Sequence, residues 1–316
     1  MEKIGLFIEY KDEEIKPAVF GMITGARKED RDLYALVVNR NPADCKKELG
    51  EYGVDRVIGI TAADGAWHPD LWADALVQAM AAFGIQTLLG VTSPRGRDIL
   101  PRVAAQLDAP LLMDCLDVDL EKHTARTTRY SGKTVATIRL TGTHRIYGVR
   151  ANAVPAVPSP SEPSVETFTP AEADLPEMTV LETTPGRGDA VDLAEADVIF
   201  SGGRGMKNGE NFKVLFDCAR TMNAAVGASR VAVDEGWVPY AMQVGQTGTK
   251  VNPKVYIACG ISGSIQHFAG MKSSDIIIAI NTDPNAAIIS KSDYYAVADL
   301  FEVIPRLTKR LEEDRR

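Results

Sequence analysis

The sequence has few of the residues that bind metal ions or form cross-links. Its four cysteines, Cys45, Cys115, Cys218 and Cys259, lie far apart without a C-x-x-C pair, and there are only four histidines. Metal sites usually need such side chains at short, regular spacing. The sequence therefore predicts no metal site. Cys218 and Cys259 lie inside apolar patterns and are expected to be buried free thiols.

Long apolar runs and an excess of positive charge are also missing. No stretch approaches the ~20 apolar residues of a membrane-spanning helix, so we expect no membrane insertion. The formal net charge is −8, which argues against nucleic-acid binding because such proteins carry a basic face. The N-terminal MEKIGLFIEY has neither a secretory signal nor an Arg-rich presequence. The expected location is therefore the cytoplasm of a prokaryote.

Common catalytic and cofactor motifs are missing as well. There is no G-x-S-x-G and no Cys–His pair at a motif spacing, so a nucleophile activated by a base is not expected. The dinucleotide fingerprint G-x-G-x-x-G is incomplete, because Gly203-Arg204-Gly205 is followed by MKN instead of the third glycine. These absences argue against nucleophilic catalysis and against a classical dinucleotide site. An NAD(P)-dependent enzyme on a related sheet stays an alternative.

The chain does have the alternation of strands and helices that is typical of parallel α/β sheets. Apolar runs at residues 3–9, 33–38, 55–60 and 86–91 predict strands, and the patterns at 70–83 and 97–107 predict covering helices. Residues 111–150 instead carry β-favouring segments in succession, including 133–140 and 144–149. We expect them to form a hairpin-rich excursion that closes the N-terminal domain.

Three carboxylates in that excursion, Asp114, Asp117 and Asp119, lie close together in the sequence. Their spacing favours a solvated strand face over a metal or acid–base site.

A proline-rich stretch separates the two halves of the chain. Seven of the 17 prolines fall within residues 155–185. Proline fixes φ and lacks a backbone donor, so this stretch is expected to be an extended connector and not core. The predicted organisation is an N-terminal α/β domain at residues 1–154, a connector at 155–188 and a second α/β domain at 189–316.

The second domain contains a Gly- and Ser-rich corner at residues 255–270, VYIACGISGSIQHFAG. An apolar run meets Gly260, Ser262, Gly263 and Ser264, and a helical pattern follows. Such a strand–turn–helix junction suits a phosphate, because backbone N–H groups and the positive end of the helix dipole point at one spot. A helix at about 209–224, with Asn208 as its N-cap, is predicted upstream.

Four strand-like runs of this domain end in small or polar loops, after Phe200, Ala258, Ile280 and Val297. Loops at the carboxyl ends of parallel strands lie at one sheet edge, where ligands bind in a crevice. This brings together Arg204, residues 262–267, Asn281 and Asp299. A nucleotide-like ligand is expected there, with Arg204 neutralising phosphate charge.

Arg230 and His267 suggest a redox-active ring. A reduced isoalloxazine carries negative charge near N1 and the C2 oxygen, and a nearby cation or strong donor raises its potential. We expect both side chains to stabilise the anionic, one-electron-reduced ring. His267 has a second interpretation, that of a buried histidine with satisfied hydrogen bonds, and the sequence leaves both open.

A series of motifs in the second half resembles the electron-transfer flavoprotein alpha subunit: SGGRG, GENF, AAVGASR, VDEGWVP, QVGQTG, GISGSIQH, INTDP and VADLF. The resemblance is dense over residues 197–305 and weak before 155. It implies a Rossmann-like FAD-binding domain and a heterodimer with a beta subunit. In that family the complex carries electrons from dehydrogenases, such as acyl-CoA dehydrogenases of fatty-acid beta-oxidation, to a quinone oxidoreductase or similar acceptor.

The resemblance also implies roles for individual residues. Arg230 would lie over the flavin ring, Thr247 or Ser229 near N5, and His267 near the C2 oxygen. Asn281, Asp299 and Leu300 would hold the adenosine half. The full set of implied FAD contacts is Arg204, Ser229, Arg230, Gln243, Val244, Gly245, Gln246, Thr247, Gly260, Ile261, Ser262, Gly263, Ser264, Ile265, Gln266, His267, Asn281, Asp283, Asp299 and Leu300. Thr249-Lys250 after QTG departs from the family pattern and puts only a peripheral contact in doubt.

Two further interpretations stay open. A flavin-bifurcating complex would oxidise NADH with a second FAD in the beta subunit, where the plain carrier would hold AMP, and its alpha chain would look much the same. A non-redox assembly module that kept only the fold is disfavoured by the nearly complete set of FAD-site residues.

Overall fold

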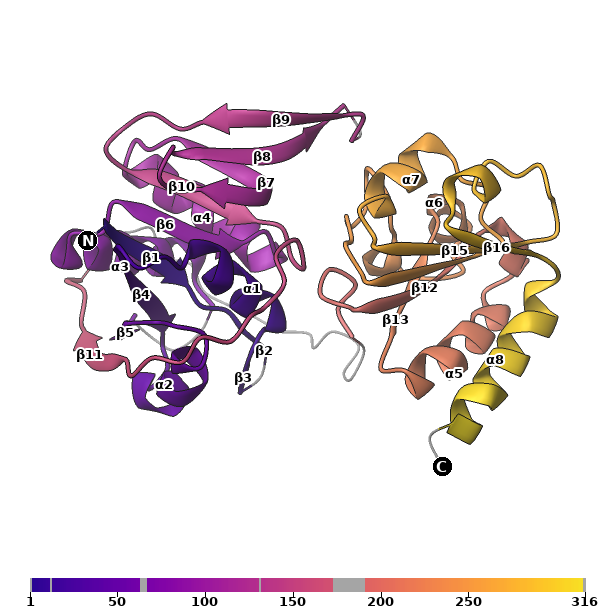
Figure 1. Ribbon diagram of the computed structural model, residues 1–316, viewed down its shortest axis with the longest axis horizontal. Helices are drawn as coiled ribbons and strands as arrows, with labels where there is room; N and C mark the ends of the chain where they lie inside the picture. Colours follow the sequence, from indigo (N-terminus) through magenta and orange to yellow (C-terminus); the bar gives the residue numbers. More distant parts are fainter. Residues whose placement is uncertain (1, 12, 63–66, 131, 173–190, 315–316) are drawn as a thin grey trace. The chain divides into compact units, whose positions relative to one another are not determined.

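The computed structural model describes residues 2–11, 13–62, 67–130, 132–172 and 191–314. The chain forms two compact units, one mainly from the first 184 residues and the other mainly from residue 185 onwards. Each unit is a mainly parallel sheet with covering helices (Figure 1). The predicted α/β class is confirmed.

The N-terminal unit is built on a nine-stranded sheet in the order β11-β5-β4-β1-β6-β10-β7-β8-β9. Its strands are β1 (Glu2–Phe7), β4 (Arg31–Val38), β5 (Arg56–Ile60), β6 (Thr87–Val91), β7 (Leu111–Asp119), β8 (Thr124–Arg129), β9 (Thr134–Arg139), β10 (Arg145–Val149) and β11 (Ser164–Phe168), and β2 (Tyr10–Lys11) with β3 (Glu14–Ile15) forms a separate ladder. The helices are α1 (Pro17–Ala26), α2 (Pro42–Gly50), α3 (Pro69–Phe83) and α4 (Pro94–Gln106).

Helices cover both faces of this sheet. Alternate residues of β1 point to opposite faces: Ile4 and Leu6 join a buried cluster with α1 and α2, while Phe7 joins a second cluster with α3 and α4. This double cover explains why the strands read as continuous apolar runs in the sequence.

The excursion after β6 differs in part from the expectation. β7 and β8 pair antiparallel, as in a hairpin. β10, however, inserts between β6 and β7 and pairs parallel with both. Ile146 and Tyr147 of β10 are fully buried, so this strand gains cover on both faces as an interior strand. Its β-favouring composition predicts a strand but not the partners of that strand.

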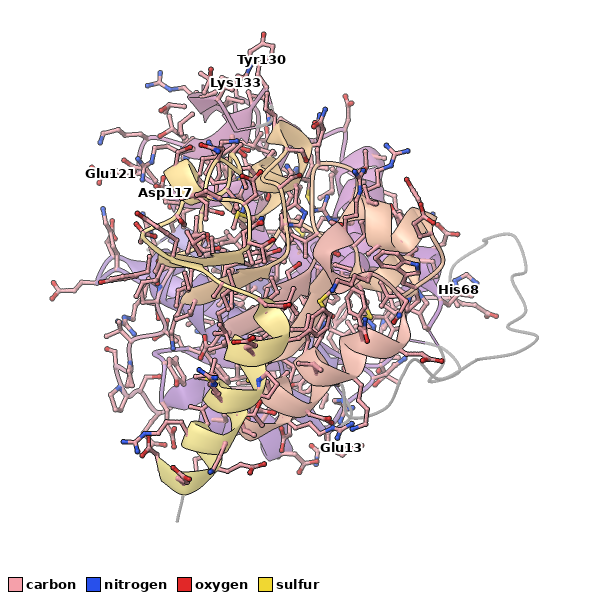
Figure 2. All side chains as sticks on the ribbon, turned by 90° about the vertical axis from the view of Figure 1, so that its right-hand side faces the viewer. Glu13, His68, Asp117, Glu121, Tyr130 and Lys133 are labelled. Carbon is pink, nitrogen blue, oxygen red and sulfur yellow. The ribbon has the colours of Figure 1, made fainter. Side chains whose placement is uncertain are left out.

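The carboxylates of the excursion form ion pairs. Asp114 binds Arg150 with a 2.8 Å contact, and both side chains are buried, so the predicted solvated face is wrong for Asp114. Asp117, which Figure 2 labels, pairs with Arg126, and Asp119 accepts from Lys122. Among the described residues, no three His, Cys, Asp or Glu side chains are placed to hold a metal ion.

Part of the predicted connector belongs to the N-terminal sheet. β11 pairs parallel with β5 from Ser164 opposite Arg56 to Phe168 opposite Ile60. Connector residues 173–188 lie outside the described residues.

The C-terminal unit has five parallel strands in the order β13-β12-β14-β15-β16. The strands are β12 (Val198–Gly202), β13 (Ala225–Ala228), β14 (Val255–Cys259), β15 (Ile276–Asn281) and β16 (Tyr294–Val297). The helices are α5 (Lys213–Thr221), α6 (Arg230–Asp234), α7 (Ile265–Met271) and α8 (Leu300–Asp314), with short 3₁₀ turns at Arg204–Met206, Glu210–Phe212, Tyr240–Met242 and Ile289–Lys291.

The two faces of this sheet carry different helices. Ile257 and Cys259 of β14 pack with α5 and α8, whereas Tyr256 and Ala258 lie in the cluster that contains Met271 of α7. Cys218 and Cys259 are buried free thiols, as predicted. Across the described residues, no helix has the length and apolar character needed to cross a membrane.

The predicted helix at 209–224 is shorter than expected. α5 begins only at Lys213, after the 3₁₀ turn Glu210–Phe212. The Oδ1 atom of Asn208 accepts from the backbone N–H of Asn211 at 3.0 Å. Asn208 therefore bonds a backbone N–H of the 3₁₀ turn and is not the N-cap of α5, which follows Phe212 without a side-chain cap.

Candidate functional site

The strand order places a crevice between the ends of β12 and β14. The chain passes from β12 to β13 on one side and later returns to β14 on the other side. The connections after these two neighbouring strands therefore diverge, and ligands of open α/β sheets bind at such a switch point. The predicted meeting of the loops after β12, β14, β15 and β16 at one edge is confirmed by the parallel pairing.

The two loops at the switch point are joined through their backbones. The N–H of Gly203 donates to the carbonyl of Cys259 at 2.9 Å, and that of Gly205 donates to Gly260 at 3.0 Å. A Cβ on Gly205 would lie 2.7 Å from the Gly260 Cα atom. Only glycine permits this close approach, so SGGRG and the corner after β14 form one wall.

The corner turns through two glycines with positive φ, Gly260 at +61° and Gly263 at +85°. α7 follows with only seven residues, and the Ser264 Oγ caps it by accepting from the His267 N–H at 3.4 Å. The macrodipole of so short a helix is smaller than the sequence pattern suggests. The shape of the loop, more than the dipole, therefore defines the corner.

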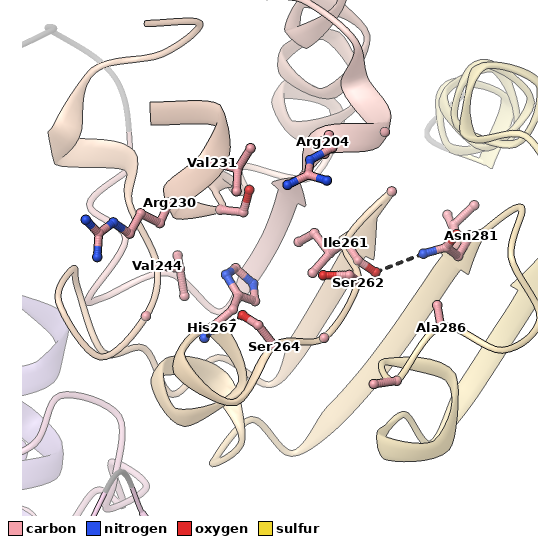
Figure 3. A pocket seen from close by; sticks show the side chains of 18 of the residues that line it. Arg204, Arg230, Val231, Val244, Ile261, Ser262, Ser264, His267, Asn281 and Ala286 are labelled. Carbon is pink, nitrogen blue, oxygen red and sulfur yellow. Dashed lines mark hydrogen bonds between the residues drawn. The ribbon is translucent and has the colours of Figure 1, made fainter. Parts of the chain in front are cut away.

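A cavity of about 1100 Å³ lies at this edge of the sheet (Figure 3). The structure brings together every predicted site residue except Ile265, which is an exposed residue of α7. The cavity-lining members of the predicted set are Arg204, Ser229, Arg230, Gln243, Val244, Gly245, Gln246, Thr247, Gly260, Ile261, Ser262, Gly263, Ser264, Gln266, His267, Asn281, Asp283, Asp299 and Leu300.

Two hydroxyls lie where the segment from Gln243 to Thr247 meets α6. The Thr247 Oγ1 accepts from the Gln243 Nε2 at 3.0 Å. A hydroxyl that accepts in this way keeps its own proton for a further bond. The Ser229 Oγ is the N-cap of α6 and accepts from the Ala232 N–H at 3.5 Å. Both hydroxyls therefore keep a proton that they can donate to a ligand.

Arg230 pairs with a carboxylate. Its Nε lies 3.2 Å from the Asp234 Oδ2, and 69% of its side chain is exposed. In Figure 3 its guanidinium points away from His267 and Arg204. An exposed arginine finds the carboxylate one helical turn away, so this structure does not place it towards the centre of the cavity. Its place over a flavin ring stays a prediction.

His267 is buried and is hydrogen-bonded at one nitrogen. Only 5% of the residue is exposed, and its Nε2 lies 3.0 Å from the Tyr256 hydroxyl. Its Nδ1 makes no hydrogen bond of good geometry within the described parts of the chain, although the backbone of Val244 lies close enough to act against the effect of burial on the ring's pKa. Burial lowers the pKa of His267 to about 4. The ring is therefore neutral near pH 7, and one of its polar atoms is left for a ligand.

The lowered pKa of His267 predicts a loss of stability in acid. The ordinary pKa of histidine is about 6.5, and that of folded His267 is about 4. At pH values between the two, the unfolded chain binds a proton at this residue and the folded chain does not. Stability from this group is therefore complete above pH 6.5 and falls by about 3 kcal/mol as the pH drops to 4. Urea unfolding of the ligand-free chain from pH 7 to 4.5 should show a shallower pH dependence for His267→Gln. A slope unchanged from wild type would contradict this, and His144→Gln is the control.

Two cations line the opposite part of the cavity. Arg204 and Lys207 are exposed, and neither forms an ion pair with a described residue, although the Lys207 Nζ lies 5.1 Å from the centre of the Phe301 ring. Cations without carboxylate partners suit an anionic ligand. The sequence prediction includes Arg204 but misses Lys207. The signal that could have found it is a second cation only three residues after Arg204 in the same loop.

The residues predicted for an adenosine half also stabilise the loops. The Asn281 Nδ2 donates to the carbonyl of Ile261 at 2.9 Å (Figure 3), and its Oδ1 accepts from the Asp283 N–H at 3.0 Å. The Asp299 Oδ1 accepts from the Phe301 N–H at 2.9 Å, at the start of α8. Asn281 therefore ties the end of β15 to the corner after β14.

Other lining residues were not predicted either. Asp234 lies four residues after Arg230, a spacing that favours an ion pair on a helix. Ala286 and Ala287 line the cavity beyond the end of β15. Their small side chains leave room there, and nothing in the local sequence marks them as ligand contacts.

A doubly wound α/β unit with a cavity at its switch point is typical of proteins that bind a nucleotide cofactor. Two family models match the chain: the electron transfer flavoprotein FAD-binding domain at residues 192–272 and the electron transfer flavoprotein domain at residues 4–173. The chain belongs to the electron transfer flavoprotein alpha-subunit family.

Curated relatives agree over nearly the whole chain. The electron transfer flavoprotein subunit alpha of Pseudomonas aeruginosa is 35% identical over 95% of this chain and 97% of its own length. The Bacillus subtilis protein of the same name is 37% identical over 99% of this chain and 98% of its own. A probable mitochondrial alpha subunit of Caenorhabditis elegans is 37% identical over 96% of this chain and 92% of its own.

Proposed function

We propose that the chain is the FAD-binding alpha subunit of a heterodimeric electron carrier that moves electrons from dehydrogenases, such as acyl-CoA dehydrogenases, to a quinone oxidoreductase or similar acceptor. The observation that carries this proposal is the single cavity at the β12–β14 switch point. There Arg204 and Lys207, which form no ion pair with a described residue, line one space together with the Thr247 hydroxyl and His267.

The lining residues fit the parts of FAD. Arg204 and Lys207 would meet the pyrophosphate, together with the serines of the corner, Ser262 and Ser264. Thr247 has a proton to donate, and His267 has an unpartnered nitrogen, so both can hydrogen-bond the polar edge of the isoalloxazine. When bound, FAD supplies the electron-transfer chemistry. The chain binds the cofactor, keeps a neutral imidazole beside it and needs no nucleophile or base.

The partner of this chain follows from the same proposal. The curated relatives are named as alpha subunits, which supports a beta subunit that completes the complex. We propose that this beta subunit carries AMP. A second FAD in place of AMP would correspond to the bifurcating, NADH-oxidising alternative. The cytoplasmic location stays a prediction, since one of the relatives is described as mitochondrial.

The decisive experiment is to purify the chain with its beta subunit and count the flavins per heterodimer. One FAD that accepts electrons from an acyl-CoA dehydrogenase would support the plain carrier. Two FADs that NADH reduces would replace it by the bifurcating complex. A preparation without flavin that binds NAD(P) would overturn the proposal in favour of an NAD(P)-dependent enzyme.

The Arg230–Asp234 pair predicts opposite changes in potential. Replacing Arg230 with alanine removes a cation from the rim and should lower the first-electron potential. Asp234→Asn removes the competing carboxylate and should raise it. Spectroelectrochemistry of the heterodimer would measure both shifts. Two shifts of the same sign would contradict a role of the Arg230 charge in setting the flavin potential. The matched control is Lys213→Ala, which breaks the Lys213–Asp217 pair of α5.

A further inference from the structure

Tyr256 lies directly behind the cavity-lining imidazole. It is a fully buried residue of β14, on the sheet face that also packs α7. Its hydroxyl lies 3.0 Å from the His267 Nε2, and the two rings meet edge-on, with centroids 6.1 Å apart. Tyr256 does not line the cavity, so it can influence a ligand only through His267.

The direction of this hydrogen bond follows from counting protons. Burial raises the pKa of Tyr256 well above its usual range, so the phenol keeps its single proton. Burial also keeps His267 neutral, with one N–H and one acceptor nitrogen. If the phenol donates to Nε2, the imidazole proton must be on Nδ1.

The reverse direction leaves more buried groups unsatisfied. If Nε2–H donated to the phenol oxygen, the Tyr256 proton would need another acceptor. Ser201 is the nearby candidate, and its side chain lies close enough to lower the phenol pKa through a hydrogen bond, but within the described chain its Oγ makes no hydrogen bond of good geometry. The phenol proton would then have at best a poorly aligned acceptor, and the Nδ1 lone pair would be unpaired. Each such group costs about 1–3 kcal/mol, so donation from Tyr256 to Nε2 is favoured.

We propose that Tyr256 is a positioning residue that holds neutral His267 as the Nδ1–H tautomer, so that Nδ1, which makes no well-aligned hydrogen bond within the described chain, is a hydrogen-bond donor to the cofactor. The acceptor that fits is a carbonyl oxygen or ring nitrogen of the flavin that gains negative charge on reduction, since such a group strengthens the bond. This inference rests on the proposed FAD function and adds a residue outside the cavity to it.

The first test needs neither a variant nor a flavin. ¹⁵N–¹H NMR of the ligand-free full chain, labelled at histidine, distinguishes the two tautomers of His267 at pH 7. The expected result is a protonated Nδ1 and an acceptor Nε2. A neutral imidazole protonated at Nε2 would overturn the proposal even if FAD binds as proposed. Because this measurement needs no flavin, it still tests the tautomer of His267 if the chain proves not to bind FAD.

The second test uses Tyr256→Phe in the heterodimer. Loss of the donor should mix the tautomers of His267 and weaken the preference for reduced over oxidised FAD about fivefold. For one electron this is a potential about 40 mV lower, because tenfold corresponds to 59 mV. An unchanged potential with normal FAD content would overturn the proposal. Tyr147→Phe, at another buried tyrosine whose hydroxyl has no partner within the described chain, is the matched control and should change neither readout.

Discussion

Replacing Gly263 with alanine should remove most FAD from the purified heterodimer, with a flavin content at least tenfold below wild type. Gly263 has a φ of +85°, and an added Cβ would lie 2.4 Å from the Ile288 backbone nitrogen. The Gly263 carbonyl also accepts from the Lys291 Nζ at 2.8 Å. The loop is held by the Ile288 backbone on one side and by the Lys291 contact on the other. It therefore cannot make room for the alanine side chain without changing shape. Flavin absorbance per protein measures the loss.

Gly236→Ala separates this effect from ordinary backbone strain. Gly236 has a similar φ of +72°, but nothing lies within 4 Å of an added Cβ. The variant should be less stable by about 1–2 kcal/mol, the cost of a left-handed conformation with a side chain, and should keep its FAD. Equal flavin loss in both variants, or full FAD in Gly263→Ala, would show that the corner does not hold the cofactor.

Replacing Arg204 with alanine should weaken FAD binding about 10- to 150-fold. Hydrogen bonds to charged groups contribute about 1.5–3 kcal/mol, and each 1.4 kcal/mol is a factor of ten in Kd. Arg204 has no ion pair among the described residues, so in the free chain its charge is not already neutralised by a carboxylate. Titration of flavin-depleted heterodimer with FAD measures the change, and the loss should shrink as salt screens the charge.

Two variants accompany this test. Arg204→Lys keeps the charge but loses the forked geometry and should bind with intermediate affinity. Arg220→Ala removes an equally exposed arginine that lies on α5 outside the cavity and pairs with Asp217. It should leave the Kd unchanged. A Kd for Arg204→Ala equal to that of Arg220→Ala would exclude a phosphate role for Arg204.

The sheet edge could be predicted because it depends on local patterns. The apolar runs before Ser201, Cys259, Asn281 and Ala298 predict strands, and parallel strands must present their following loops at one edge. Glycine at 203, 205, 260 and 263 marks close backbone approaches that larger residues forbid. The residues of the cavity could therefore be named from motifs far apart in the chain.

The partners of individual side chains could not be predicted in the same way. The composition of residues 144–149 favours a strand, but the interior position of β10 depends on which neighbours cover Ile146 and Tyr147. Arg230 was predicted over the ring, yet in the free chain it pairs with Asp234, which is close in sequence and equally exposed to solvent. Such choices depend on competing contacts of similar free energy.

His267 shows most clearly which features the sequence determines and which depend on the tertiary structure. The sequence by itself determined the α/β class, the loop edge that forms the cavity and the presence of a histidine there, because periodicity and glycine positions depend on short-range sterics. Only the tertiary structure decided that this histidine is neutral, that Tyr256 meets its Nε2 and that its Nδ1 makes no well-aligned hydrogen bond within the described chain. Burial and hydrogen-bond direction depend on residues that meet only when β14, α7 and the segment around Val244 pack together.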